Sequence, residues 1–209
     1  MSLHINQIAP NFTQKAYVDG KNIDLNLYDY IENDWLVLFS HPKDFTPVCT
    51  TELGAAQSIY PEFEKRNTKL LALSVDSLDS HARWIPDIIE TSKLQSFQYP
   101  IIADEDRKVS LLYDLIHPDA DDTFTVRSVF FIDPDKKLRT ILIYPHTVGR
   151  NFDELLRVLD ALQTVDSKKV ATPANWKKGD KAIIPPSVKD TSEYKNVDEI
   201  KPYLRYTDI

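Results

Sequence analysis

The chain has 209 residues and a formal net charge of −7, with 25 lysines and arginines against 32 aspartates and glutamates. This length exceeds what a minimal domain needs and suits one domain with an appendage. The acidic balance argues against nucleic acid or an anionic membrane as the main partner. We expect a soluble, cytoplasmic protein without stable membrane association, because the first residues do not resemble a signal peptide and no apolar run is long enough to span a bilayer.

The first half of the chain alternates strand-like and helix-like runs. "WLVLFS" (35–40) is a continuous apolar run, which is typical of a strand buried on both faces. The helix after it begins at Thr46 as N-cap with Pro47 in its first turn, and Pro61 interrupts it. The same alternation predicts strands at 69–75 and 99–104 and helices at 80–93 and 107–115.

The second half changes pattern. Two strand-like runs, 123–133 and 137–145, flank the turn sequence "PDK" and predict a β-hairpin. Residues 151–163 place apolar side chains on one helical stripe. From about residue 166 the chain is rich in proline and lysine, which predicts an arm packed on the body or on a partner subunit.

This order of elements predicts an α/β protein. Two βα units, a hairpin and a closing helix give a thioredoxin-like fold with a central mixed sheet flanked by helices. We expect this domain to cover residues 1–165 and a small C-terminal arm domain to cover 166–209.

Cys49, the only cysteine, falls in the first turn of the predicted helix. There the free backbone N–H groups and the positive end of the helix dipole favour a thiolate. The Thr46 hydroxyl can donate to the sulfur or to a bound oxygen, and Pro42 stiffens the loop and removes a backbone donor. Arg127 lies inside a strand-like run and needs an anionic partner if it faces the interior. A small buried hydrophobe is the alternative for Cys49, and these residues alone leave both possibilities open.

Three stretches resemble one family. "PKDFTPVC" resembles the P-x-x-x-T-x-x-C signature of peroxiredoxins, and "SHPKDFTPVCTTELG" is similar to the 1-Cys subgroup, the peroxiredoxin 6 type. Residues 144–163 resemble the family's closing helix, and residues 170–186 resemble its C-terminal domain. The resemblance implies a thiol peroxidase that reduces hydrogen peroxide and organic hydroperoxides to water and alcohols through a cysteine sulfenic acid.

The resemblance also assigns roles by position. Cys49 is the peroxidatic cysteine, and Thr46 matches the threonine that contacts both thiolate and peroxide. Pro42 matches the proline that shields the sulfur, and Arg127 the arginine that holds the thiolate and polarises the peroxide. Three further residues match supporting members of the site: Glu52, His41 and Arg150.

The single cysteine determines how the cycle closes. No second thiol is present to form a disulfide, so an external thiol such as glutathione or thioredoxin must reduce the sulfenic acid. No motif for a metal or a nucleotide occurs, and we expect no metal and no cofactor. The resemblance implies a homodimer paired through strand edges.

Two other functions would use the same cysteine. One is a cysteine hydrolase that pairs Cys49 with His41, and the other is a non-catalytic thioredoxin-fold chaperone or redox sensor. The remaining histidines stand near turns or helix starts, where we expect surface or capping roles: His4, His81, His117 and His146.

A phospholipase A2 activity occurs in some members of the resembled subgroup. It is attributed to a serine in a G-D-S-W-G-like stretch with a histidine upstream. Here Asp34 stands in place of the serine and Tyr28 in place of the histidine. An aspartate cannot replace that nucleophile in acyl transfer, so we predict no phospholipase activity by this mechanism.

Overall fold

The structure is a computed structural model that describes residues 3–120 and 123–209, so the first two residues of the predicted peroxidase domain and residues 121–122 lie outside it. The chain forms two compact units, Met1–Phe152 and Asp153–Ile209. Each unit has its own β-sheet among the described residues.

The sheet of the first unit has seven strands in the described part of the chain. They are β1 (Thr13–Val18), β2 (Lys21–Asn26), β3 (Trp35–Ser40), β4 (Thr68–Ser74), β5 (Ile101–Ala103), β6 (Arg127–Ile132) and β7 (Leu138–Tyr144). Their order is β2-β1-β5-β4-β3-β6-β7. Strands β3, β4 and β5 are parallel, whereas β1, β2, β6 and β7 pair antiparallel. This is the predicted mixed sheet of a thioredoxin-like fold.

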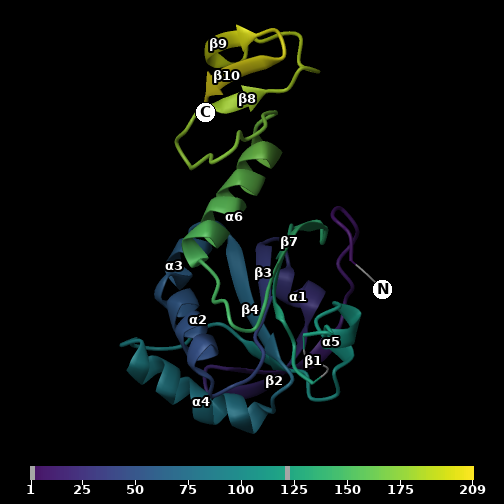
Figure 1. The fold of residues 1–209 in the computed structure, drawn as a ribbon, viewed down its shortest axis with the longest axis vertical. Coiled ribbons are helices and arrows are strands. Elements are labelled where there is room, and N and C mark those ends of the chain that lie inside the picture. Colours follow the sequence, from purple (N-terminus) through teal and green to yellow (C-terminus); the bar gives the residue numbers. More distant parts are fainter. Residues whose placement is uncertain (1–2, 121–122) are drawn as a thin grey trace. The chain divides into compact units, whose positions relative to one another are not determined.

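Helices cover both faces of this sheet (Figure 1). They are α1 (Leu27–Ile31), α2 (Pro47–Ser58), α3 (Tyr60–Glu64), α4 (Leu78–Thr91) and α5 (Lys108–Leu112). The break between α2 and α3 lies at Ile59, just before Pro61, as the sequence predicts. Pro86 lies inside α4 on its exposed side, and α4 continues through it.

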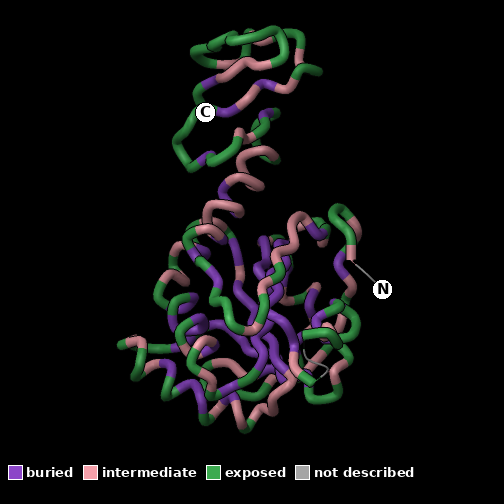
Figure 2. Tube along the Cα trace, viewed as in Figure 1, coloured by how far each residue is buried: buried purple, intermediate pink, exposed green. Residues whose placement is uncertain are grey.

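Alternate side chains of β3 enter the cores on the two faces of the sheet. Leu36 and Leu38 belong to a buried cluster that includes Leu27 and Ile31 of α1 and Val109 of α5. Val37 and Phe39 alternate with these two leucines and point to the opposite face, where Figure 1 shows α2 and α4. All six residues of β3 are buried (Figure 2), so the apolar run at 35–40 is the central strand that it predicts.

The second unit combines a helix and a small sheet. Helix α6 (Phe152–Ser167) leads into it, and β8 (Ala182–Ile184), β9 (Lys195–Lys201) and β10 (Leu204–Asp208) pair antiparallel in the order β8-β10-β9. Trp176 is buried, and its indole N–H donates to the carbonyl of Asp180. The predicted arm therefore contains a sheet of its own. Across the described residues, every helix is too short or too polar to cross a membrane.

Helices α2 and α4 approach each other closely at Gly54. A Cβ atom on Gly54 would lie 1.9 Å from Ser92 Oγ and 2.8 Å from Ser92 Cβ. Rotating the Ser92 hydroxyl relieves only the first of these overlaps. Replacing Gly54 by alanine must therefore push the C-terminal end of α4 away from α2.

We expect Gly54→Ala to lower the free energy of unfolding by about 1–3 kcal/mol, the usual cost of overpacking a buried contact. Urea unfolding followed by circular dichroism measures it. The double variant Gly54→Ala/Ser92→Gly is the matched test, because it removes the overlapping side chain and should recover part of the loss. A Gly54→Ala protein as stable as the parent would contradict this account.

Candidate active site

Cys49 is the third residue of α2 and is fully buried. Thr46 is the N-cap with an extended backbone (φ −113°, ψ 146°), and Pro47 occupies the first helical position. The sulfur therefore lies in the first turn of a twelve-residue helix, near backbone N–H groups that have no partner within the helix. This end of the helix carries partial positive charge and favours a thiolate.

Arg127, the first residue of β6, reaches the sulfur. Its Nη1 lies 3.2 Å from Cys49 Sγ and 2.6 Å from Glu52 Oε2. Its Nε and Nη2 donate to the carbonyl of His146 at 2.9 and 2.7 Å. The guanidinium is almost fully buried and is held on two sides, so it cannot swing away from the sulfur.

Glu52 binds two arginines at once. Its Oε2 accepts from Arg127 Nη1 and from Arg150 Nη2 at 2.7 Å, and its Oε1 accepts from Nε and the backbone N–H of Arg150 at 2.9 and 2.8 Å. Burial would raise the pKa of Glu52, but the charge and hydrogen bonds of Arg150, with the charge of Arg127, outweigh it and hold this pKa below its ordinary 4.5. Glu52 is therefore a carboxylate.

Arg150 is anchored to the sheet as well as to Glu52. Its Nη1 donates to the carbonyls of Ser40 and Ser128 at 2.8 and 3.2 Å, at the ends of β3 and β6. Its guanidinium carbon lies 5.0 Å from the centre of the Phe39 ring. The predicted pair of supporting residues, Glu52 and Arg150, thus joins α2 to two strands.

The Thr46 hydroxyl does not make the contact with the Cys49 sulfur that the family resemblance implies. Its hydroxyl donates to the carbonyl of Lys43 at 2.8 Å, and it makes no hydrogen bond to Cys49 Sγ within the described residues. The reason is local, because the chain turns between Lys43 and Thr46 and presents that carbonyl to the hydroxyl. Pro42 is buried in the same loop.

His41 also faces away from the sulfur. Its Nε2 lies 2.8 Å from Asp44 Oδ1, and within the described residues it makes no hydrogen bond to Cys49. The other oxygen of Asp44 lies 2.7 Å from Nδ1 of His81. His41 and His81 are both fully buried, so the expected surface or capping role of His81 is wrong. Nothing in the sequence spacing pairs Asp44 with a histidine 37 residues away.

A possible set of metal ligands lies at this point of the fold. His41, Asp44 and Asp76 offer ligand atoms within 4.8 Å of one another. The Asp44 oxygens are occupied by the two histidines, and Asp76 Oδ2 accepts from the Asp44 backbone N–H and from the Ser74 hydroxyl. These contacts explain the cluster without a cation, and the absence of a metal stays a prediction.

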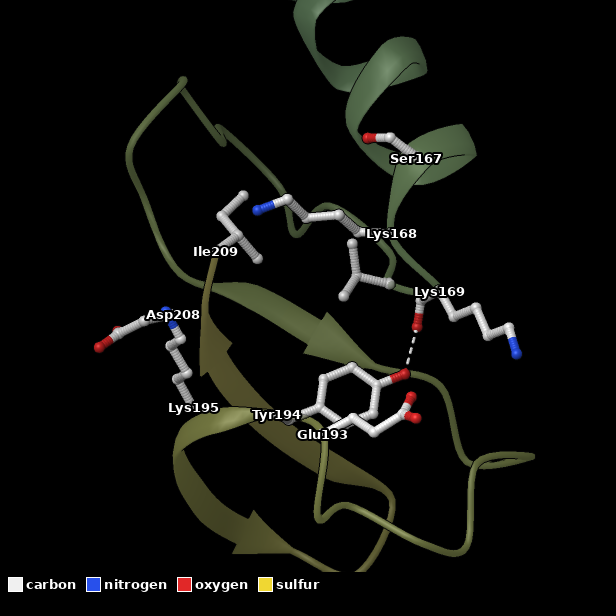
Figure 3. Close-up of a pocket in the computed structure, with 9 residues that line it drawn as sticks. Ser167, Lys168, Lys169, Glu193, Tyr194, Lys195, Asp208 and Ile209 are labelled. Atoms are coloured by element: carbon white, nitrogen blue, oxygen red, sulfur yellow. Dashed lines mark hydrogen bonds between the residues drawn. The ribbon is translucent and has the colours of Figure 1, made fainter.

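The second unit has a pocket of its own (Figure 3). Its volume is about 350 Å³, and its lining includes Lys168, Lys169, Lys195 and Tyr194. The Tyr194 hydroxyl donates to the carbonyl of Lys169 at 2.8 Å and fixes the ring. The residues predicted for catalysis are not part of this lining.

Comparison with known proteins gives a consistent picture. The family model described as "AhpC/TSA family" matches residues 5–141, and the model "C-terminal domain of 1-Cys peroxiredoxin" matches 161–196. The 1-Cys peroxiredoxin of Dictyostelium discoideum is 53% identical over an alignment of 209 positions, which covers 98% of this chain and 85% of that protein.

Two solved structures share the fold. One is yeast mitochondrial 1-Cys peroxiredoxin, with a TM-score of 0.91 and 49% identity over 99% of this chain and all of that chain. The other is a cysteine-to-serine mutant of peroxiredoxin 6 of Arenicola marina, with a TM-score of 0.91 and 41% identity over 99% of this chain and 98% of the other.

Glu52→Gln tests the buried charge cluster. It keeps the shape of the side chain but leaves two buried guanidinium groups without their counter-ion, so we expect the free energy of unfolding to fall by about 3–5 kcal/mol. Guanidinium chloride unfolding at neutral pH measures the change.

The pH dependence has a definite sign. Because the pKa of Glu52 is lowered on folding, its stabilisation is present above its ordinary value of 4.5 and is lost as pH falls through the folded-state value. The acid limb of the stability profile should therefore be flatter in Glu52→Gln. Glu62→Gln, at an exposed ion pair, is the matched control and should change stability little. Equal effects of the two substitutions would contradict the special role of Glu52.

Proposed function

Since the chain belongs to the AhpC/TSA family and is a 1-Cys peroxiredoxin with thiol peroxidase activity, we propose that Cys49 attacks the peroxide and that Arg127, Thr46 and Pro42 form its site. The observation that carries this proposal is the distance of 3.2 Å between Arg127 Nη1 and Cys49 Sγ. A buried sulfur beside a fixed guanidinium is suited to be a thiolate, which is the nucleophilic form.

Charge balance supports the thiolate. The two guanidinium groups of Arg127 and Arg150 surround the single carboxylate of Glu52, which leaves one excess positive charge in the interior. An anionic sulfur on Cys49 neutralises it. A neutral thiol would leave that charge uncompensated, and buried uncompensated charge is costly.

The reaction is a displacement at oxygen. The Cys49 thiolate gives an electron pair to one peroxide oxygen, the O–O bond breaks, and the other oxygen leaves with the bonding pair and takes up a proton from solvent. The products are a sulfenic acid on Cys49 and one molecule of water or alcohol. Donors aimed at the leaving oxygen lower the barrier because negative charge grows there in the transition state.

Arg127 has a donor for that purpose. Of its five N–H groups, one on Nε and one on Nη2 donate to His146, and those on Nη1 face Glu52 and Cys49. The second N–H of Nη2 has no partner within the described residues, and we assign it to the leaving oxygen of the peroxide.

Thr46 orients the peroxide by accepting a hydrogen bond. Its own hydroxyl hydrogen is committed to the carbonyl of Lys43, so its oxygen is left as an acceptor for the peroxide O–H. Pro42 has no N–H to offer and is buried, which limits water beside the sulfur.

An external thiol completes the cycle. The single cysteine offers no partner for an intramolecular disulfide, so the sulfenic acid on Cys49 condenses with an external thiol and a second thiol releases the sulfur. The thiol-resolving mechanism of the yeast mitochondrial relative proceeds via glutathione/thioredoxin systems, and we propose a thiol of this class here. For this chain we propose a cytoplasmic location, which differs from the mitochondrial location of that relative.

The alternatives are less well supported. A cysteine hydrolase needs His41 at the sulfur, but Asp44 holds His41 and Arg127 is the group beside Cys49. A non-catalytic module gives no reason for the buried charge cluster. For phospholipase chemistry, Asp34 pairs with Lys69 at 3.3 Å and the Tyr28 hydroxyl donates to the carbonyl of Ala9, which are structural contacts.

We propose that residues 1–165 form the peroxidase domain and residues 166–209 its C-terminal arm.

We also propose a homodimer formed through β7. Among the described strands β7 pairs with β6 alone. On its other edge Leu138 exchanges backbone hydrogen bonds with Asn6 and Gln7, and the strand beyond Leu138 has no strand partner there among the described residues. Ile143, in that part of β7, exposes 55% of its surface. An exposed apolar edge strand is a ready template for a second chain.

Equimolar peroxide tests the peroxidase function. We expect the reduced protein to gain one oxygen within minutes by intact mass, and a sulfenate-specific reagent to trap it. Cys49→Ser should gain none, and Arg127→Gln should react far more slowly while it remains folded by circular dichroism. An inert thiol in the folded parent protein would sink the proposal.

Ile143→Glu tests the dimer. A charge placed on the open edge of β7 should shift the protein to monomers in analytical ultracentrifugation. Leu111→Glu on α5, where the side chain is 66% exposed, is the matched control and should leave the association unchanged. If both variants sediment as the parent does, β7 is not the contact.

A further inference from the structure

A buried group of three ionisable side chains lies next to the proposed site and has no part in the reaction as derived above. Asp44 lies between His41 and His81, with Oδ1 2.8 Å from His41 Nε2 and Oδ2 2.7 Å from His81 Nδ1. All three side chains are 2% exposed or less. Two histidines that share one buried carboxylate raise the question of which of the three groups carries a charge.

The contacts of His81 determine its protonation. Its second ring nitrogen, Nε2, lies 3.2 Å from the carbonyl oxygen of Ile102, which can only accept. Its Nδ1 faces Asp44, which can only accept when it is a carboxylate. Both nitrogens then carry a proton, so His81 is an imidazolium paired with Asp44.

The state of Asp44 agrees with this assignment. Burial would raise the pKa of Asp44, but the hydrogen bonds from His41 and His81 outweigh it and hold this pKa well below its ordinary 3.8. The carboxylate balances one positive charge, and His81 supplies it. His41 is then neutral, with its single proton on Nε2 toward Asp44 and its buried Nδ1 without a partner among the described residues.

Asp44 connects this group to the catalytic loop. It lies between Pro42 and Thr46, and its backbone N–H donates to Asp76 at 2.9 Å. The neighbouring Phe45 has a left-handed backbone (φ 54°), which is strained for a bulky residue and persists only where the surroundings impose it. The hold of His81 and Asp76 on Asp44 supplies that constraint.

Trp84 of α4 supports the same loop. Its ring centre lies 5.2 Å from that of His41 and 6.2 Å from that of Phe45. Its indole N–H donates to the hydroxyl of Thr50, the residue after Cys49. The start of α4 therefore holds both the loop before α2 and the first turn of α2.

We propose that His81 is a positioning residue for peroxide reduction: as an imidazolium between Asp44 and the carbonyl of Ile102, it fixes the loop that carries Pro42 and Thr46 and sets the proton of His41 on Nε2. It touches neither the peroxide nor the sulfur and acts through Asp44. The proposal rests on the proposed peroxidase function.

The charged and titratable groups that face His81 are few. Asp44 comes from the loop before α2, His41 lies on the far side of that carboxylate, and Asp76 at the end of β4 holds the Asp44 backbone. From β5 the facing group is the carbonyl of Ile102, which does not titrate. Among the described residues, no second carboxylate contacts the His81 ring.

Nitrogen-15 NMR of the parent protein, labelled at histidine, tests the protonation directly. We expect one ring whose two nitrogens both carry a proton at neutral pH, as the contacts of His81 with Asp44 and with the Ile102 carbonyl require. That signal should be absent in His81→Asn. A His81 ring with one protonated nitrogen at neutral pH would overturn the proposal, and this measurement does not depend on any variant folding.

The reaction rate tests the positioning role. We measure the second-order rate constant for oxidation of Cys49 by hydrogen peroxide in the parent, His81→Asn and Ile88→Val. His81→Asn keeps an N–H toward Asp44 but has no charge, and we expect a loss approaching about 10²-fold, the scale for a misplaced catalytic group. Ile88→Val removes a buried methylene from α4 without touching the histidines and should react at the parent rate.

Three outcomes separate the possibilities. An unchanged rate in His81→Asn overturns the positioning role. An equal loss of rate in Ile88→Val and His81→Asn also overturns it, because any weakening of α4 would then slow the reaction to the same extent. If the parent itself is not oxidised by peroxide, it is the peroxidase function that fails, and the NMR result still decides the charge of His81.

Discussion

One buried carboxylate between two guanidinium groups is the constraint on which the site depends. Glu52 of α2 accepts from Arg127 of β6 and from Arg150 of the loop before α6, so three distant segments meet at one side chain. One positive charge remains in excess, and the sulfur of Cys49 lies 3.2 Å from Arg127 Nη1. The same three charged side chains therefore carry both the stability of the buried cluster and the environment of the sulfur.

The sequence predicted the parts of this structure whose cause is local. The apolar run 35–40 can only be a strand buried on both faces, and Thr46 with Pro47 marks a helix start. The hairpin of β1 and β2 was missed, although Asp19 and Gly20 carry a turn signal and both have positive φ. Strand β9 was missed because each of its residues is exposed, which leaves no apolar alternation to read.

Pairing across the fold could not be predicted in the same way. A family motif associates Arg127 with Cys49, but no spacing or composition pairs Asp44 with His81, and a histidine at a helix start resembles a surface residue. The direction in which a hydroxyl group donates its hydrogen bond cannot be predicted from the sequence either. The Thr46 hydroxyl donates its hydrogen bond to the carbonyl of Lys43, three residues back, which is determined by the geometry of the loop and not by residue type.

The complete burial of Cys49 places the same demand on both halves of the catalytic cycle. A sulfur that presents no surface cannot be reached by a peroxide or by an external thiol until its surroundings move. Both steps therefore require a local opening at the first turn of α2, against contacts such as those of Trp84 with Thr50 and of Arg127 with Cys49. The stability of these contacts, which lie outside the reacting atoms, thereby couples the folding of α2 to the access of both reactants to the sulfur.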